Sequence, residues 1–456
     1  MTDFSSLSLS PALGQALDAL GYARMTPIQA GSLPPVLEGR DVIAQARTGS
    51  GKTAAFGLGL LSRLDPATSR VQALVLCPTR ELADQVSKEI RKLARFLPNI
   101  KVSTFCGGVP LRPHLASLGH EPHIVVGTPG RVLELAQMDA LKLDALRMLV
   151  LDEADRMLDM GFEAAMTDLI GMAPKVRQTL LFSATYPDEI RAISRRFQRE
   201  PVEVTVDAAP SDSGIEQRFY EVETARKPDA LALLLAENPP ESAIVFCNTR
   251  RDVDEVAQLL AQRGFPVLAL HGDLEQRDRD EVLVRFANRS CTVLVATDVA
   301  ARGLDIELLG AVISYELATD VDGHTHRIGR TGRAGQAGLA LALVASREMS
   351  RMPAIEARYG STRWQRIDLS KRPGPPPQAA MATLVIDAGR QDKLRPGDVV
   401  GALTGDAGLP GTAIGKIDSF ATRTYVAIQR PLAAKALERM RAGKIKGRNF
   451  RVRKLG

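Results

Sequence analysis

The chain has 456 residues, a length that corresponds to about three domains. Its hydrophobic fraction of 45% is ordinary for globular proteins and excludes a wholly disordered chain. The formal charge of +6 is unevenly distributed, because residues 423–456 contain eleven Lys or Arg and one acidic residue, whereas residues 1–422 contain 48 basic and 52 acidic residues. A local basic excess indicates a site for a polyanion, and a solvated charged face is the alternative.

The cysteines and the N-terminal sequence bear on the compartment. The four cysteines are far apart and form no CxxC pair, which argues against a zinc site or a disulfide scaffold and fits a reducing compartment. The first residues, MTDFSSLSLS, have neither the basic start nor the apolar core of a signal peptide. No apolar run approaches the ~18 residues needed to span a bilayer. We therefore expect a cytoplasmic protein that does not bind a membrane.

Two stretches rich in small residues and proline, 207–214 and 370–380, are typical of linkers. They divide the chain into segments 1–206, 215–369 and 382–456. In the first two segments, short apolar runs such as ALVLCPT and CTVLVATD alternate with helical patterns such as ELADQVSKEIRKLARFL. This alternation predicts an α/β fold with parallel sheets covered by helices on both faces. Ligands of such sheets bind at the carboxyl ends of the strands.

The first apolar run, DVIA, leads into ARTGSGKT, residues 46–53, which matches a phosphate-binding loop with Ala46 in place of the first glycine. Glycines let backbone N–H groups surround phosphate oxygens at a helix N-terminus. We expect Lys52 to reach the β and γ phosphates of ATP, and Thr53 to place its hydroxyl on Mg²⁺. A simple turn before a helix is the alternative. The predicted cofactor-binding residues of this loop are Thr48, Gly49, Ser50, Gly51, Lys52 and Thr53.

The stretch RMLVLDEADRML, residues 147–158, indicates a buried strand that ends in a carboxylate cluster. Asp152 is placed to hold Mg²⁺, and Glu153 to orient or deprotonate the attacking water. The alternative is the ordinary preference of acidic residues for a helix N-terminus. A phosphate-binding loop in the same segment favours the catalytic interpretation.

Residues 382–456 have a different pattern. Strands are indicated at TLVIDAG, IGKIDSF, TYVAIQ and KIKGRNFRVRKL, and helices at RPGDVVGALTGDA and PLAAKALERMRA. The predicted order is βαββαβ, a small split sheet. In the last predicted strand, residues 444–455, alternation places Lys444, Lys446 and Arg448 on one side and Ile445 on the other.

Across residues 1–369 the motifs together resemble those of the DEAD-box RNA helicases. DEAD, residues 152–155, is the naming signature of that family. The other matches occur in the family's order, with Met25 where proline is common; they are GYARMTPIQA, PTREL, GG, TPGR, SAT, VFCNTR, HGDLEQRDR, ATDVAARGLD and HRIGRTGR. The resemblance implies two tandem RecA-like domains and an RNA-dependent ATPase.

The resemblance also implies contacts to the nucleotide base and to the nucleotide from the second domain. Gln29 has an amide that suits the edge of adenine. Phe4 would either stack on the same base or serve as a packing anchor. Gly303 and Asp305 would contact the nucleotide from the second domain.

Catalysis and coupling are implied for a further set of residues. Arg330 and Arg333 resemble arginine fingers, which stabilise charge developing on the γ-phosphate. His326 would join the DEAD carboxylates to this motif, or else be an ordinary core histidine. Ser183 and Thr185 would couple the ATP and RNA sites, or simply cap a helix.

Because the phosphate loop and the arginines fall in different domains, we expect ATP to draw the domains together and hydrolysis to release them. Closure would assemble a groove for one RNA strand, contacted through its sugars and phosphates. Taken singly, most of the implied residues would be strand-end caps. The resemblance places these contacts at Thr79, Arg80, Gly108, Thr128 and Arg131 in the first domain and at Arg250, Arg279, Thr297 and Asp298 in the second.

In the third segment, KLRPGDVVGALTGDAGL, GKID, YVAI and GKIKGRNFRVRKL resemble the C-terminal, RRM-like domain of the DbpA helicases, which binds a hairpin of large-subunit ribosomal RNA. An ordinary RRM stacks bases on aromatic residues, but TRTYVAIQ offers only one, which can also be an ordinary strand residue. We therefore expect a basic edge to bind folded RNA. The candidate residues are Arg423, Tyr425, Lys444, Lys446, Arg448, Arg451 and Arg453.

The expected protein is a monomeric, ATP-dependent RNA helicase that separates short RNA duplexes during assembly of the large ribosomal subunit, within pre-ribosomal particles. Two alternatives are an ATP-gated RNA clamp with little unwinding and a DNA-directed helicase. Stimulation of the ATPase by RNA but not by DNA separates the helicase interpretations, and a duplex-unwinding assay tests the clamp.

Overall fold

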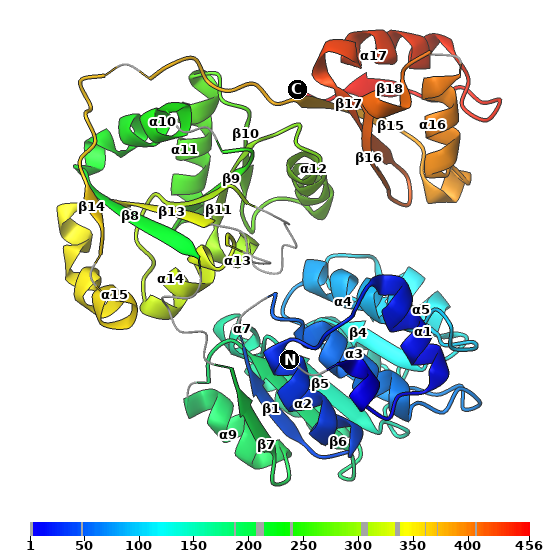
Figure 1. The fold of residues 1–456 in the computed structure, drawn as a ribbon. Coiled ribbons are helices and arrows are strands. Elements are labelled where there is room, and N and C mark those ends of the chain that lie inside the picture. The colour runs from blue at the N-terminus through cyan, green and yellow to red at the C-terminus, as the bar shows by residue number, and fades with distance from the viewer. Residues whose placement is uncertain are drawn as a thin grey trace. The chain divides into compact units, whose positions relative to one another are not determined.

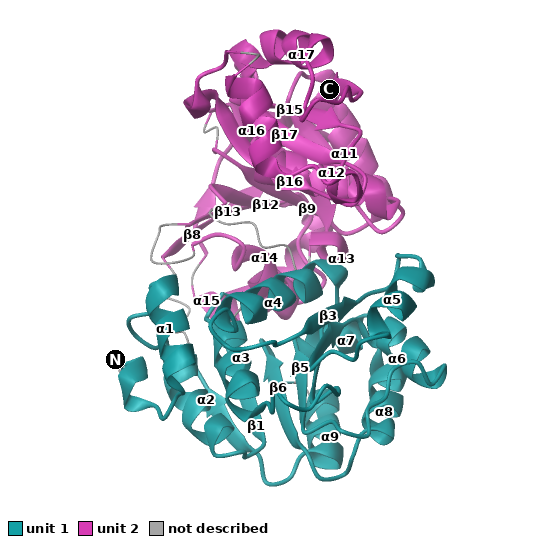
Figure 2. Cartoon of the chain, turned by 90° about the vertical axis from the view of Figure 1, so that its right-hand side faces the viewer, with its two compact units in different colours: residues 1–209, 302–305 teal, residues 210–301, 306–456 magenta. Residues whose placement is uncertain are grey.

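A computed structural model describes residues 3–46, 49–186, 188–206, 214–237, 240–301, 309–332, 338–360, 362–371, 373–405 and 408–456. The chain forms two compact units (Figure 2), the first made of residues 1–209 and 302–305 and the second of the remaining residues. The predicted second and third segments therefore belong to one compact unit. No helix among the described ranges is long and apolar enough to cross a membrane.

The first unit contains a seven-stranded sheet in the order β3-β4-β2-β5-β6-β1-β7, in which every pairing is parallel. The predicted parallel sheet is confirmed. Its strands are β1 (Val42–Gln45), β2 (Ala73–Leu76), β3 (Val102–Phe105), β4 (Ile124–Gly127), β5 (Met148–Asp152), β6 (Gln178–Ser183) and β7 (Val202–Thr205).

Helices cover both faces of this sheet (Figure 1), because successive strand residues point to opposite faces and both sets are apolar. On β5, for example, Val150 packs with one cluster and Leu149 and Leu151 with the other. The helices are α1 (Pro11–Leu20), α2 (Pro27–Leu37), α3 (Lys52–Arg63), α4 (Arg80–Leu93), α5 (Leu111–Leu118), α6 (Pro129–Gln137), α7 (Ala154–Asp159), α8 (Glu163–Met172) and α9 (Asp188–Phe197).

The second unit begins with another seven-stranded parallel sheet, in the order β10-β11-β9-β12-β13-β8-β14. Its strands are β8 (Ile215–Glu221), β9 (Ala243–Cys247), β10 (Val267–Leu270), β11 (Val293–Thr297), β12 (Ala311–Ser314), β13 (Gly338–Val344) and β14 (Trp364–Gln365). Its helices are α10 (Lys227–Glu237), α11 (Arg250–Gln262), α12 (Gln276–Ala287), α13 (Asp298–Ala301), α14 (Val321–Ile328) and α15 (Met352–Tyr359).

The C-terminal part is an antiparallel four-stranded sheet in the order β16-β17-β15-β18. Its elements follow the predicted βαββαβ order, and are β15 (Met381–Ile386), α16 (Pro396–Thr404), β16 (Ile414–Ser419), β17 (Thr424–Gln429), α17 (Ala433–Ala442) and β18 (Val452–Lys454). Short 3₁₀ turns lie at η1 (Phe4–Ser6), η3 (Thr224–Arg226), η4 (Ser346–Arg351), η5 (Arg390–Asp392), η6 (Gly411–Ala413) and η7 (Arg430–Leu432).

The predicted long final strand is wrong in its first half. Residues 445–448 form a tight turn closed by an isolated bridge between Ile445 and Arg448, and only β18 is a strand. Lys446 and Gly447 both have left-handed backbones, with φ values of 53° and 75°, a pattern that belongs to turns rather than to strands. The expected alternation of Lys444, Lys446 and Arg448 along one strand edge therefore does not exist.

One face of the C-terminal sheet is covered by the larger sheet's helix α12. Val284 of α12 packs in a buried cluster with Val385, Tyr425 and Leu455. Beside it, Thr383 Oγ1 accepts a hydrogen bond from Asn288 Nδ2 (2.8 Å) and shares another with Ser290 Oγ (2.6 Å), all in the interior. The opposite face packs on α16 and α17.

Candidate nucleotide and RNA sites

The phosphate loop lies between β1 and α3, at the carboxyl end of a central strand. Gly49 and Gly51 have φ values of 82° and 93°, which glycine adopts without strain. The buried Lys52 side chain folds back over the loop, where its Nζ donates to the Ala46 carbonyl at 2.9 Å. Thr53 follows in the first turn of α3. The loop therefore presents an ammonium group and a helix N-terminus at one place, which suits phosphate.

The segment before the loop is tied to it by two side chains. Thr26 and Gln29 form a reciprocal capping box at the start of α2. Thr26 Oγ1 donates to the Ser50 carbonyl at 2.7 Å, and Gln29 Nε2 donates to the Gly51 carbonyl at 3.1 Å. Gln29 is thus anchored against the phosphate loop, and its adenine-reading role stays a prediction.

Phe4 is buried in the core of the first unit, with 6% of its surface exposed. Its ring packs edge-to-face against Tyr22, with centroids 6.1 Å apart, and the Tyr22 hydroxyl donates to Glu89 at 3.0 Å. This geometry corresponds to the packing-anchor alternative, because a buried ring is not available to stack on adenine.

The acidic cluster begins at the last residue of β5, a strand next but one to β1 in the sheet. Asp152 is buried, and burial raises its pKa to about 7, against the favourable charge of Lys52. Glu153 is also buried and has a left-handed backbone with φ of 51°. Non-glycine residues held in this conformation cluster at functional sites. Asp152 lies close enough to Lys52 of the phosphate loop for the lysine's charge to act on its carboxylate, and Glu153 follows it directly.

The third acidic residue, Asp155, connects the cluster to the SAT motif. Its Oδ2 accepts hydrogen bonds from the backbone N–H and the hydroxyl of Thr185, both at 2.9 Å. Its own N–H donates to Ser183 Oγ at 3.3 Å. Ser183 and Thr185 therefore contact the acidic cluster directly. This role of Asp155 was not predicted, although its place in the DEAD motif was a signal for it.

In the second unit, Arg330 follows α14 and is buried. His326 lies in α14 and is half-buried. Their proposed action on the other unit stays a prediction. The remaining predicted residues of the nucleotide site, Thr48, Gly303, Asp305 and Arg333, lie outside the described residues.

Arg327, for which no role was predicted, lies at the centre of a buried hydrogen-bond network. Arg327 is 1% exposed and forms two hydrogen bonds with Asp298, at 2.8 and 2.7 Å. It also donates to Asn248 Oδ1 at 2.7 Å and stacks over Phe246. Arg327 lies one helical turn before Arg330, and this i, i+3 spacing in HRIGR was the signal that could have found it.

The predicted RNA contacts of the first unit gather at one sheet edge. They follow β2, β3 and β4, which are adjacent parallel strands, so their carboxyl ends meet. Thr79 caps α4 by accepting from Leu82 N–H at 3.2 Å, and Thr128 accepts from Gly107 N–H at 3.2 Å. Arg80 begins α4, Gly108 has a φ of 72°, and Arg131 donates to the Val109 carbonyl at 2.8 Å.

The predicted contacts of the second unit have a matching place beyond β9 and β11, which are adjacent. Arg250 is exposed and paired with Asp273. Arg279 donates to the Ala300 carbonyl at 2.7 Å, and Thr297 Oγ1 accepts from Ala300 N–H at 3.3 Å. Asp298, as described, is engaged by Arg327.

In the C-terminal sheet, Tyr425 is 2% exposed and faces α12. As an RNA-stacking residue it is corrected, because its ring is covered. The turn residues Lys444, Lys446 and Arg448 are exposed, and so is Arg451. Lys446 and Arg448 have half-buried acidic neighbours, Asp398 at 3.7 Å and Asp392 at 4.0 Å. Arg423 pairs with Asp387 at 3.6 Å, and Arg453 is half-buried on β18.

Two parallel-sheet domains in one chain, with a phosphate loop, strand-end carboxylates and a buried arginine motif, define a nucleotide-dependent nucleic-acid motor. Comparison with known families agrees: DEAD/DEAH box helicases match residues 26–193, the helicase conserved C-terminal domain matches 226–335, and the DbpA RNA binding domain matches 383–454. The chain belongs to the DEAD-box ATP-dependent RNA helicases.

Among its relatives, the ATP-dependent RNA helicase DbpA of Escherichia coli is 54% identical over the full length of both chains. The DEAD-box ATP-dependent RNA helicase CshA of Geobacillus kaustophilus is 44% identical over 78% of this chain and 76% of its own. Among solved structures, S. cerevisiae Dbp5 bound to RNA and ADP BeF3 is similar with a TM-score of 0.73, at 29% identity, over 81% of this chain and 96% of that one.

Proposed function

We propose that this RNA helicase is directed by its C-terminal domain to a hairpin of large-subunit ribosomal RNA. It acts as a monomer in the cytoplasm, separating short duplexes in pre-ribosomal particles as the large subunit assembles. The observation that carries the proposal is that the DbpA RNA binding domain, residues 383–454, coincides with the basic part of the chain. A helicase core that contacts only sugars and phosphates has no sequence preference of its own, so another part of the protein has to select the RNA.

Within the first unit, the geometry divides the work on ATP. Lys52 and the N-terminus of α3 bind the phosphates, while Gln29 and Thr26 hold the loop in shape. Glu153 orients the attacking water and takes its proton. Thr185 and Asp155 transmit the state of the acidic cluster to the RNA-facing edge, because they are hydrogen-bonded to one another.

Thr53 and Asp152 fit a magnesium ion, since hydroxyl and carboxylate oxygens are the ligands Mg²⁺ prefers. Mg²⁺ is usually held by only one or two carboxylates together with substrate phosphates, so a large acidic cluster is not needed. A cation beside Asp152 would favour the charged form of a carboxylate whose pKa burial has raised. When bound, the ion neutralises charge on the phosphate oxygens.

The second unit completes the site in this proposal. Arg330 and Arg333 stabilise charge on the γ-phosphate, and His326 connects to the acidic cluster. Arg327 is a positioning residue: its buried bonds to Asp298 and Asn248 hold the start of the motif in place.

In this proposal, Lys444 and the exposed turn at residues 445–448 select the RNA hairpin. The test replaces Lys444, Lys446 and Arg448 by Gln in the full-length protein, which avoids new repulsion from Asp392 and Asp398. ATPase activity is then measured with fragments of large-subunit ribosomal RNA hairpins and with scrambled hairpins. We expect the variant to lose most of the preference while an excess of either RNA still stimulates it. An unchanged preference would contradict the role of this turn.

A further inference from the structure

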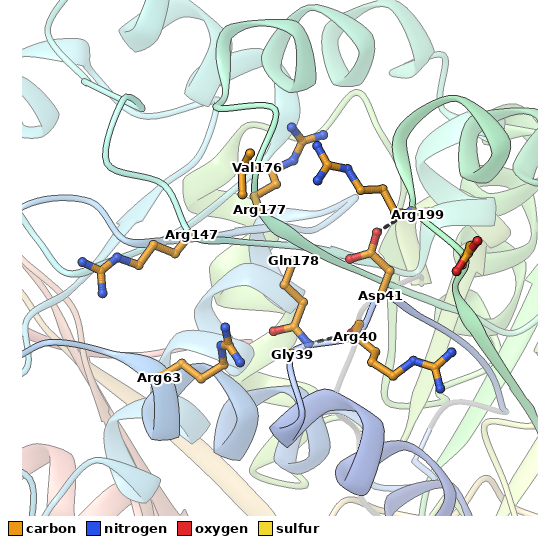
Figure 3. A pocket seen from close by; sticks show the side chains of 10 residues that line it. Gly39, Arg40, Asp41, Arg63, Arg147, Val176, Arg177, Gln178 and Arg199 are labelled. Atoms are coloured by element: carbon orange, nitrogen blue, oxygen red, sulfur yellow. Dashed lines mark hydrogen bonds between the residues drawn. The ribbon is translucent and has the colours of Figure 1, made fainter.

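The first unit contains a pocket rich in arginine (Figure 3). Five of its ten lining residues are arginines and two are acidic. No motif of the helicase family singles out this place. The lining residues are Gly39, Arg40, Asp41, Arg63, Arg147, Val176, Arg177, Gln178, Arg199 and Glu200.

The pocket lies at the amino ends of the strands. Arg40 and Asp41 precede β1, Arg147 precedes β5, Gln178 begins β6 and Arg199 precedes β7. The phosphate loop and the acidic cluster follow the carboxyl ends of the same parallel strands. The six residues of β6 correspond to about 20 Å, so the pocket is separate from the nucleotide site and from the predicted RNA groove.

Two acidic residues against five arginines leave the pocket with an excess of positive charge. The Asp41 carboxylate is buried and accepts hydrogen bonds from the backbone N–H groups of Thr179 (2.6 Å) and Arg199 (2.7 Å). It therefore serves to fix β6 and the segment before β7. Glu200 is exposed at the rim and forms no ion pair with the pocket arginines among the described residues.

Three arginines of the pocket have guanidinium groups that are available to a ligand. Within the described part of the chain, the guanidinium groups of Arg40, Arg63 and Arg147 have neither a hydrogen bond nor an ion pair, and all three residues are exposed. Gly39 lies beside the Arg63 guanidinium and has a left-handed backbone, with φ of 85°, which favours glycine.

The other two arginines use part of their guanidinium groups within the protein, Arg177 half-buried and Arg199 exposed. Arg177 donates from Nη1 to the Pro174 carbonyl at 2.7 Å, while its buried Nε has no hydrogen-bond partner. Arg199 donates from Nη2 to the Lys175 carbonyl at 2.6 Å. Val176, next to Arg177 in the sequence, is 79% exposed. The pocket therefore combines guanidinium groups arranged around it with one exposed apolar side chain (Figure 3).

We propose that this pocket binds the phosphate backbone of RNA that extends beyond the helicase groove. Guanidinium groups match phosphate oxygens in geometry and stay charged at every physiological pH. Arginines spread around an open rim suit an extended polyanion, and RNA is the polyanion on which this family acts. The exposed Val176 provides an apolar contact for a ribose or a base. The pocket would thus hold flanking RNA while the groove works on the duplex.

The test uses full-length protein carrying Arg40→Glu, Arg63→Glu and Arg147→Glu together. A second triple variant with Gln at these positions removes the charge without adding repulsion. The matched control is Arg195→Glu, an exposed arginine of α9 outside the pocket. Binding is measured for one hairpin RNA with and without a long single-stranded tail, at several salt concentrations. ATPase activity with the untailed hairpin verifies that each variant is folded.

We expect the tail to raise wild-type affinity and the triple variants to lose that gain, with untailed binding and Arg195→Glu unchanged. Loss of three phosphate contacts to single-stranded RNA should lower the slope of log affinity against log salt concentration by about 2. This change corresponds to about 20-fold in affinity between about 50 and 200 mM salt. Three outcomes overturn the proposal. The tail has no effect on the affinity of the wild type, or the triple variants bind the tailed RNA as tightly as the wild type does, which is the result expected if the pocket binds an acidic protein. In the third, the triple variants lose equal affinity for the tailed and the untailed RNA.

Discussion

Thr383 of β15 makes a buried contact with the residues that follow α12. This contact tests how the C-terminal domain is attached to the second parallel-sheet domain. Replacing Thr383 by Val keeps the shape but removes the oxygen that accepts from Asn288 and bonds to Ser290. All three side chains are buried, with exposures of 1%, 5% and 7%. A buried polar group left without a partner costs about 1–3 kcal/mol. Asn288 Nδ2 loses its acceptor, whereas Ser290 Oγ keeps its hydrogen bond to the Arg285 carbonyl, so the expected loss in the free energy of docking is about 1–3 kcal/mol.

This loss corresponds to a rise of about 5- to 150-fold in the open population, since about 1.4 kcal/mol is a factor of ten. Hydrogen exchange measures it directly: amides of α12 and β15 should exchange faster in Thr383→Val, while those of α10 serve as an internal reference. Unchanged exchange in α12 and β15 would refute the view that these hydrogen bonds hold the domains together.

The remaining predictions concern the motor and its stability. Lys52→Ala should abolish ATP hydrolysis in a steady-state assay, because the phosphate charge loses its partner. Glu153→Gln should still bind ATP and RNA but accumulate the bound complex in single-turnover experiments; wild-type turnover would exclude it as the base. Arg330→Ala should lower kcat by about 10³–10⁵ with little change in ATP affinity, whereas a raised KM at constant kcat would mean uniform binding. Burial lowers the pKa of His324 to about 4, so only the unfolded chain gains a proton as pH falls from about 6.5 to 4, and stability should fall by about 1.4 kcal/mol per pH unit. In denaturant unfolding, His324→Gln should remove that slope, and an identical pH dependence in both proteins would show that another group is responsible.

Local patterns were sufficient for the sheets and for the nucleotide edge. The apolar strands are fully buried on both faces, so they appear in the sequence as continuous runs, and the motifs follow their carboxyl ends. The phosphate loop and Asp152 could be placed because loop, strand end and helix start are contiguous in sequence. Asp155 and Arg327 were missed because their partners, Thr185 and Asp298, are about 30 residues away.

The C-terminal errors have two separate causes. The predicted alternation along KIKGRNFRVRKL requires an extended chain. Gly447 lies within this stretch and is a turn signal, and its left-handed backbone belongs to the observed turn. Tyr425 alternates correctly with Val426 on β17, so its orientation away from the α16 and α17 core was predictable. That α12 covers this second face was not predictable, because no local pattern specifies which neighbour packs on an apolar patch.

The measurement that tests the central claim most directly is RNA-stimulated ATPase activity of the full-length protein and of a chain ending at Leu369, with cognate and scrambled large-subunit ribosomal RNA hairpins. Salt is raised stepwise, because phosphate contacts alone weaken steeply with salt and give little preference. The full-length protein should keep its preference for the cognate hairpin as salt rises, and the truncated motor should respond weakly and equally to both. A truncated motor that still prefers the cognate hairpin would place the specificity in residues 1–369 and contradict the account.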